Sequence, residues 1–274
     1  MSGPTSRRLQ ATQCRQTSLV PAHRCLSRTP GLQSLHVDHP LGEVDPPPPL
    51  SLPPRDNTET IVQSSLQYFF MNGSNGTFLR EISLPNLQDF RITDINEPEP
   101  APDLCLHVRS FIMRSRCTLT TLNLCSIVLN DNLLALLMAT PTVSALKISL
   151  EEIEDPATQM ASGFLSFLTV ATEQHEQTGT MSQSSSEASP QSPSESPPVL
   201  PKLKDLQLHL DYALPHFSSQ QFINMLQSRR DASEESGVTR LERVNILFLG
   251  PGASRLCRER GLQCICLSSF WWPR

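Results

Sequence analysis

The residue types in this chain that could do nucleophilic chemistry together are a cysteine, a histidine and an aspartate. Asp205 and His209 lie in one alternating segment, so both side chains would face the same side of a strand. Cys125 lies in a similar segment, two strands away in the sheet expected below. Such a set could form a Cys/His/Asp hydrolase. Strand residues of these types more often only face solvent, and GxSxG, P-loop, HExxH and GxGxxG motifs are absent in proper context. We therefore expect no enzyme and no catalytic residue, with a Cys/His hydrolase as the less favoured alternative.

Residues that could bind a metal occur without the spacing that a metal site needs. His36 and His39 bracket Asp38 just before a proline, which is more typical of a solvated turn than of a ligand pair. The chain has eight cysteines but no CxxC pair, and Cys264 and Cys266 flank a single isoleucine. We expect reduced thiols, no metal and no cofactor.

A short pattern recurs along the chain: an apolar residue, two mostly polar residues, an apolar, a polar and an apolar one. Its copies are LQSLHV, LQDFRI, LTTLNL, VSALKI, LKDLQL, LERVNI and LQCICL, which begin at Leu32, Leu87, Leu119, Val143, Leu203, Leu241 and Leu262. The last three positions alternate like a strand, and helical spacing usually follows. A repeated strand–helix unit stacks its strands in parallel, so the pattern predicts an α/β solenoid with a curved parallel sheet backed by helices.

Helices are expected where apolar residues recur three or four positions apart. The segments with this spacing are 58–71, 104–116, 131–140, 160–170, 218–230 and a short run near 253–260. Asp103 and either Asn130 or Asp131 are suitable N-caps for two of them. Ser218 and Gln221 have the spacing of a capping box.

Composition divides the chain into five parts. We expect a disordered Arg/Pro-rich arm at 1–58, a first repeat region at 59–171, a disordered Ser/Pro-rich insertion at 172–199, a second repeat region at 200–268 and a tail at 269–274. Residues 1–37 contain arginines but no Asp or Glu, which leaves a mitochondrial transit peptide as an alternative, although prolines interrupt any amphipathic helix there. Ser189, Ser192 and Ser196 precede prolines, so they could accept proline-directed phosphates.

Two blocks resemble a known family. RSRCTLTTLNL at 114–124 and LLALLMATPTVSALKISL at 133–150 resemble the leucine-rich-repeat region of F-box-domain proteins in mushroom-forming fungi, and LPKLKDLQLHL and RERGLQCICL look like the end of that region. The resemblance implies a curved solenoid, an F-box that docks on a Skp1-type adaptor, and recruitment of a substrate for ubiquitin transfer by an SCF-type ligase. Residues 1–58 contain no LPxE-like opening, so the adaptor is expected only if an F-box exists outside this chain.

The alternation of the strands also predicts a binding surface. Residues that would point away from the core line a concave face: Asp89, Arg91, Asn123, Lys147, Asp205, Gln207, His209, Arg243 and Asn245. We expect this face to bind a protein partner in a non-catalytic scaffold. A regulatory protein whose insertion binds partners on phosphorylation is the alternative. The net charge of −5 disfavours a nucleic-acid partner, and no apolar stretch is long enough for a membrane span. The expected location is cytoplasmic or nuclear.

Overall fold

The structure is a computed structural model that describes residues 12–16, 19–38, 60–73, 76–93, 104–150, 157–170, 198–210, 219–232 and 236–248. Its helices are α1 (Leu19–Arg28), α2 (Gly76–Arg80), α3 (Leu104–Ser115), α4 (Asp131–Met138), α5 (Ala157–Leu168) and α6 (Ser219–Arg230). Its strands are β1 (Thr12–Gln16), β2 (Leu32–Asp38), β3 (Ile61–Val62), β4 (Tyr68–Asn72), β5 (Ile82–Ser83), β6 (Asp89–Thr93), β7 (Thr121–Ile127), β8 (Ala145–Leu150), β9 (Asp205–Leu210) and β10 (Arg243–Phe248).

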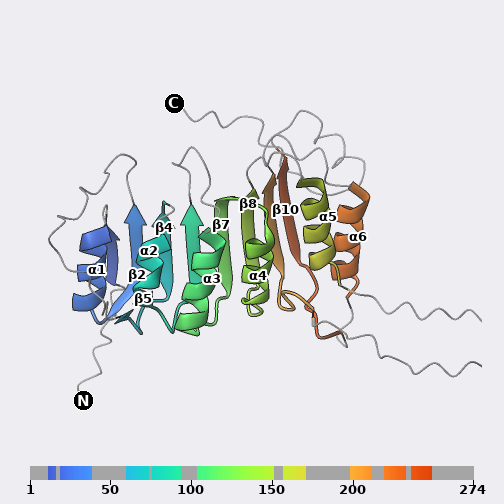
Figure 1. Cartoon of the computed structure of the whole chain (residues 1–274). Coiled ribbons are helices and arrows are strands. Elements are labelled where there is room, and N and C mark those ends of the chain that lie inside the picture. The colour runs from blue at the N-terminus through green and yellow to red at the C-terminus, as the bar shows by residue number, and fades with distance from the viewer. Residues whose placement is uncertain are drawn as a thin grey trace, which may run out of the picture.

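Eight strands form one sheet in the order β1-β2-β4-β6-β7-β8-β9-β10, and every neighbouring pair is parallel. The short strands β3 and β5 form a separate parallel pair. Strand order follows chain order, so each helix crosses between adjacent strands in the same sense. Figure 1 shows the helices side by side on one side of the sheet. The predicted α/β class, with an all-parallel sheet and interleaved helices, is confirmed.

The core lies between the sheet and these helices, and the recurring pattern supplies it. Leu119, Leu122 and Leu124 occupy the three apolar positions of one copy, and each is at most 1% exposed. In the register of the sheet, Leu122 is level with Phe90 on β6 and with Leu146 on β8. The apolar positions of neighbouring copies therefore stack into continuous buried rows, which is the packing that the pattern predicts.

Two predicted helices form as their sequences indicate. The apolar stripe of α3, which includes Val108 and Phe111, is buried, and the Phe111 ring lies 5.6 Å from the Phe90 ring of the sheet. At α4, the side-chain oxygen of Asn130 accepts a hydrogen bond of 3.0 Å from the backbone N–H of Leu133. This bond satisfies one of the free N–H groups of the first turn, so Asn130 rather than Asp131 is the N-cap.

The helix predicted at 58–71 is wrong, because this segment holds β3 and β4. The sequence from Leu66 to Met71 is a further copy of the recurring pattern: Leu66, Phe69 and Met71 are buried, as in the other copies. Tyr68 and Phe70 occupy the positions that are polar in the other copies. The sequence therefore shows no alternation here, and its apolar residues have the spacing of an apolar helix face. Aromatic side chains favour strands, and here that preference prevails.

Residues 12–16 and 19–38, which we expected to belong to a disordered arm, contain β1, α1 and β2 instead. Leu35 and Val37 of β2 are buried in the same core cluster as Leu26 of α1. The arginines and prolines of the arm lower its average apolar content, so composition concealed a complete strand–helix–strand unit. His36 and Asp38 consequently lie in a strand and not in the solvated turn that we predicted.

A buried arginine joins the two sides of the Ser/Pro-rich segment. Arg229 of α6 is 1% exposed, and its guanidinium donates hydrogen bonds to the backbone oxygens of Leu168, Val199 and Leu200 at 2.6, 2.6 and 3.1 Å. Burial lowers the pKa of Arg229 to about 10, so the group still carries its charge at neutral pH. Leu168 ends α5 and Val199 lies just before β9. The end of α5 and the chain entering β9 are therefore fixed to one side chain.

Candidate functional site

The predicted binding residues lie on the side of the sheet opposite the buried rows, which we call the polar face. It consists of strand side chains that alternate with the core residues, as in the burial pattern of β8 and β9. The register places the nine predicted residues in three rows: Asp89, Asp205 and Arg243; then Arg91, Asn123, Lys147, Gln207 and Asn245; then His209. The structure therefore brings all nine to one surface.

The aspartates of the polar face are paired with its arginines. Asp89 accepts two hydrogen bonds from Arg91, two positions along the same strand, and the nearer N–O distance is 2.9 Å. The hydrogen bond to Asp89 raises the pKa of Arg91. Asp205 forms an ion pair of 3.0 Å with Arg243 on the neighbouring strand. These pairs neutralise both ends of the mixed-charge surface.

The centre of the polar face, on β7, β8 and β9, has a different character. Lys147 on β8 is level with Asn123 on β7 and with Gln207 on β9. Burial lowers the pKa of His209, and the charge of Lys147 lowers it further. Burial raises the pKa of the Cys125 thiol, and Lys147 partly offsets that change. The centre is thus a set of neutral polar groups around one cation.

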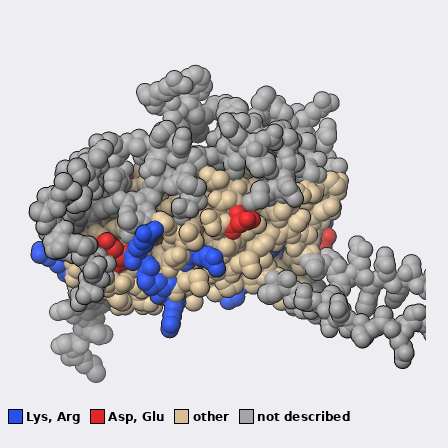
Figure 2. Space-filling view, in the orientation of Figure 1, with Lys and Arg blue, Asp and Glu red and all other residues tan. Residues whose placement is uncertain are grey.

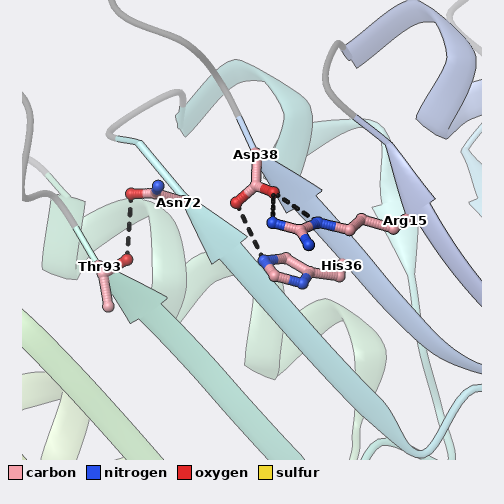
Figure 3. Close-up of polar contacts among 5 residues, drawn as sticks. All are labelled: Arg15, His36, Asp38, Asn72 and Thr93. Carbon is pink, nitrogen blue, oxygen red and sulfur yellow. Dashed lines mark hydrogen bonds and ion pairs between the residues drawn. The ribbon is translucent and has the colours of Figure 1, made fainter.

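A second polar cluster, at the ends of β1, β2, β4 and β6, was missed in the sequence (Figure 3). Asp38 accepts from Arg15 of β1 at 3.0 Å and lies 3.0 Å from Nε2 of His36. Thr93 donates its hydroxyl to the side-chain oxygen of Asn72 at 3.1 Å. The alternation of His36, Val37 and Asp38 was the available signal. This cluster links neighbouring strands through the contact of Arg15 with Asp38 and that of Thr93 with Asn72.

The sheet does not bring the Cys/His/Asp set of the hydrolase alternative together. Cys125 and His209 are separated by the whole of β8, which corresponds to about 9.6 Å between strands. Asp205 and His209 are four positions apart on one strand, or about 13 Å. The Cys125 thiol instead donates to the side-chain oxygen of Asn123 at 3.3 Å. Among the described residues, the hydrogen-bond partner of this thiol is thus an amide oxygen and not the ring of His209.

Some predicted sites lie outside the described residues. These are the phosphorylation candidates Ser189, Ser192 and Ser196, the pair Cys264 and Cys266, and His39. Within the described ranges, no three His, Cys, Asp or Glu side chains are grouped closely enough to hold a metal ion. The helices in those same ranges are all too short or too polar to span a membrane.

The helix side of the molecule also carries basic side chains, which Figure 2 shows gathered over α2 and α3. Several of them have structural partners. Arg114 of α3 donates to the backbone oxygens of Leu79 and Ile82, and Arg80 of α2 lies 3.2 Å from the ring of His107. Arg114 therefore holds the end of α2 and β5 against α3. The polar face offers the more regular surface for a partner.

The comparisons with known proteins identify no relative. No family model matches the chain, no curated protein matches it, and no solved structure matches it.

Proposed function

We propose that the chain is a non-catalytic protein-interaction scaffold of the leucine-rich-repeat type, with a curved solenoid that binds a protein partner on its polar face. The observation that carries this proposal is the register of the sheet. Consecutive strands pair in parallel and in chain order, and their polar side chains stand in continuous rows opposite the helices. Such rows form a regular surface with polar groups at a fixed spacing.

The dimensions of the face suit an extended partner. Neighbouring strands are ~4.8 Å apart, so eight strands span about 34 Å. An extended chain advances about 3.3 Å per residue, so roughly ten residues of a partner would cross the sheet. Main-chain groups of that segment would meet the amides of Asn123, Gln207 and Asn245. The side chains of the partner segment would meet the charged side chains of the polar face.

The resemblance to fungal F-box-domain proteins supports a more specific role, substrate recruitment for an SCF-type ubiquitin ligase in the cytoplasm or nucleus. In that role the polar face binds the substrate, and a Skp1-type adaptor is a partner only if an F-box exists outside this chain. The alternative is a regulatory protein in which phosphorylated Ser189, Ser192 or Ser196 binds the partner. This alternative can be tested by deleting the Ser/Pro-rich segment. The hydrogen bonds of Arg229 to Leu168 and Val199, which we call the Arg229 clamp, hold the chain on both sides of that segment.

The proposal is tested by affinity purification and mass spectrometry with the full chain. A polar-face variant carries Arg91→Glu, Lys147→Glu and Arg243→Glu. A matched control reverses the charge of three exposed cations elsewhere, with Arg24→Glu, Lys202→Glu and Arg230→Glu. Circular dichroism verifies that both variants are folded, and Lys147→Glu alone serves if the triple variant is not.

We expect the polar-face variant to lose its partners and the control to keep them. A co-eluting Skp1-type protein would support the ligase role. Retention of every partner by the polar-face variant would contradict the scaffold proposal. Loss of partners on deletion of residues 173–197, with retention in the polar-face variant, would favour the regulatory alternative.

A further inference from the structure

Lys147 differs from the other cations of the polar face. Arg15 pairs with Asp38, Arg91 with Asp89 and Arg243 with Asp205. Lys147, in contrast, has no carboxylate partner in the described part of the chain. Among the described residues, its positive charge is therefore not compensated within the face, whereas the charges of these three arginines are.

The surroundings of Lys147 leave room for an incoming group. On its own strand it stands between Ala145 and Ser149, two small side chains on the same face. Across the strands it is flanked by the neutral amides of Asn123 and Gln207. An anion that reached the ammonium would meet hydrogen-bond donors on both sides and no carboxylate on the adjacent strands at that level.

Asn245 supplies an independent sign that the face is incomplete without a ligand. Its side-chain oxygen is buried and accepts no hydrogen bond from any described residue. A buried acceptor without a donor is unfavourable, so a rotation of the Asn245 amide that turned this oxygen to the polar face, where a partner brings an N–H group, would relieve it. Asn245 lies in the same row as Lys147, two strands away, or about 9.6 Å. An extended chain covers that distance in about three residues.

We propose that the polar face binds an extended protein segment that places an Asp or Glu carboxylate on Lys147 and an N–H donor, about three residues away, on the side-chain oxygen of Asn245. A carboxylate fits better than a phosphate, because one ammonium with two neutral amides offers one positive charge, whereas phosphate sites gather several cations, usually arginines. This inference rests on the proposed scaffold function and specifies the ligand of its face.

The test is a display selection of random ten-residue peptides with the full chain as bait. Wild type is compared with Lys147→Glu, with Lys147→Gln and with Lys204→Glu. Lys204 is the matched control, because it is an exposed lysine just before β9 that pairs with Glu242. For wild type and for Lys204→Glu we expect Asp or Glu to be enriched about tenfold over Asn or Gln at one position, the factor that one charge-assisted hydrogen bond supplies. Lys147→Gln should lose this preference, and Lys147→Glu should select Lys or Arg instead. Circular dichroism checks that each bait is folded.

The outcomes separate this inference from the scaffold proposal. Peptides selected without acidic enrichment, or with the same enrichment by Lys147→Gln, would overturn the Lys147 site and leave the scaffold standing. Failure of wild type to select any peptide above the bare matrix would count against both. A selected peptide that binds more tightly when phosphoserine replaces its acidic residue, measured by fluorescence polarisation, would overturn the carboxylate assignment. A dimer of this chain that Lys147→Glu dissociates would overturn the peptide as occupant.

Discussion

Replacing Arg229 by methionine tests the clamp between α5, α6 and β9. Methionine keeps an unbranched stem of similar shape but removes the guanidinium. The side chain is 1% exposed, and its three hydrogen bonds all end on backbone oxygens rather than on a carboxylate. The substitution therefore leaves three acceptors without their donor and leaves no unpaired acid behind.

The expected loss of stability follows from two opposing contributions. Hydrogen bonds from a charged donor contribute about 1.5–3 kcal/mol each, so three contribute roughly 4.5–9 kcal/mol. Burying the cation opposes them: the fall of the pKa of Arg229 to about 10 corresponds to roughly 3 kcal/mol. The difference is centred between about 3 and 4 kcal/mol, so we expect Arg229→Met to lower the free energy of unfolding by that amount.

The measurement is urea unfolding at neutral pH, followed by far-ultraviolet circular dichroism. With a dependence of about 3 kcal/mol per molar urea, the midpoint should fall by about 1 M. Arg230→Met is the matched control, because Arg230 is the next residue of α6, its side chain is 71% exposed and it forms an exposed ion pair with Asp231. An exposed ion pair contributes little to stability because water screens it, so the control should unfold close to wild type. If Arg229→Met and Arg230→Met both unfold at the wild-type midpoint, the carbonyl contacts do not stabilise the fold and the reasoning is refuted.

Three further predictions concern the core, the thiols and pH. Leu122→Ala should lower the free energy of unfolding by about 3 kcal/mol, since Leu122 is fully buried. Its neighbour on the other face is the control, and Thr121→Ala should lower the free energy by less than about 0.5 kcal/mol. Equal urea midpoints of the two variants would contradict the burial argument. Burial raises the pKa of Cys105 to about 12 and of Cys117 to about 11. Iodoacetamide at pH 8 should therefore label both thiols far more slowly in the folded than in the unfolded chain. Equal labelling rates, measured by mass spectrometry, would contradict their burial. Burial, with a smaller contribution from Lys147, lowers the pKa of His209. The stability that neutral His209 contributes is therefore complete above the unfolded pKa of about 6.5 and is lost as the pH falls through the folded pKa. His209→Gln should reduce the dependence of the free energy of unfolding on pH between pH 7 and 5, and an unchanged dependence would disprove this.

The period of the strands was enough to predict which side chains share a face. Leu122 and Leu124 alternate with Asn123 in the sequence, and the sheet buries the first two while it places Asn123 on the polar face. This succeeds because side chains of a strand alternate with a period of two wherever one face is buried. The helices α3 and α4 were predictable for a similar reason, since their apolar spacing and the cap at Asn130 are local features.

Pairing across strands could not be predicted, because a sequence does not state its register. The ion pair between Arg15 and Asp38 joins residues from β1 and β2 that only the parallel pairing of these strands brings together. Within the residues that the structure describes, the lack of a carboxylate beside Lys147 likewise depends on its neighbours on β7 and β9. The strand β4 could not be predicted for another reason: its aromatic residues make a continuous apolar run without alternation, so period alone cannot distinguish strand from helix there.

The coincidence of strand order with chain order has a consequence for biosynthesis. A polypeptide leaves the ribosome from its N-terminus, and in this sheet each strand from β2 to β10 pairs with the sheet strand synthesised just before it. Every newly emerged strand therefore meets a finished template edge and never has to insert between two strands already joined. The nascent protein can grow by accretion during translation, with little unpaired apolar surface waiting for distant sequence.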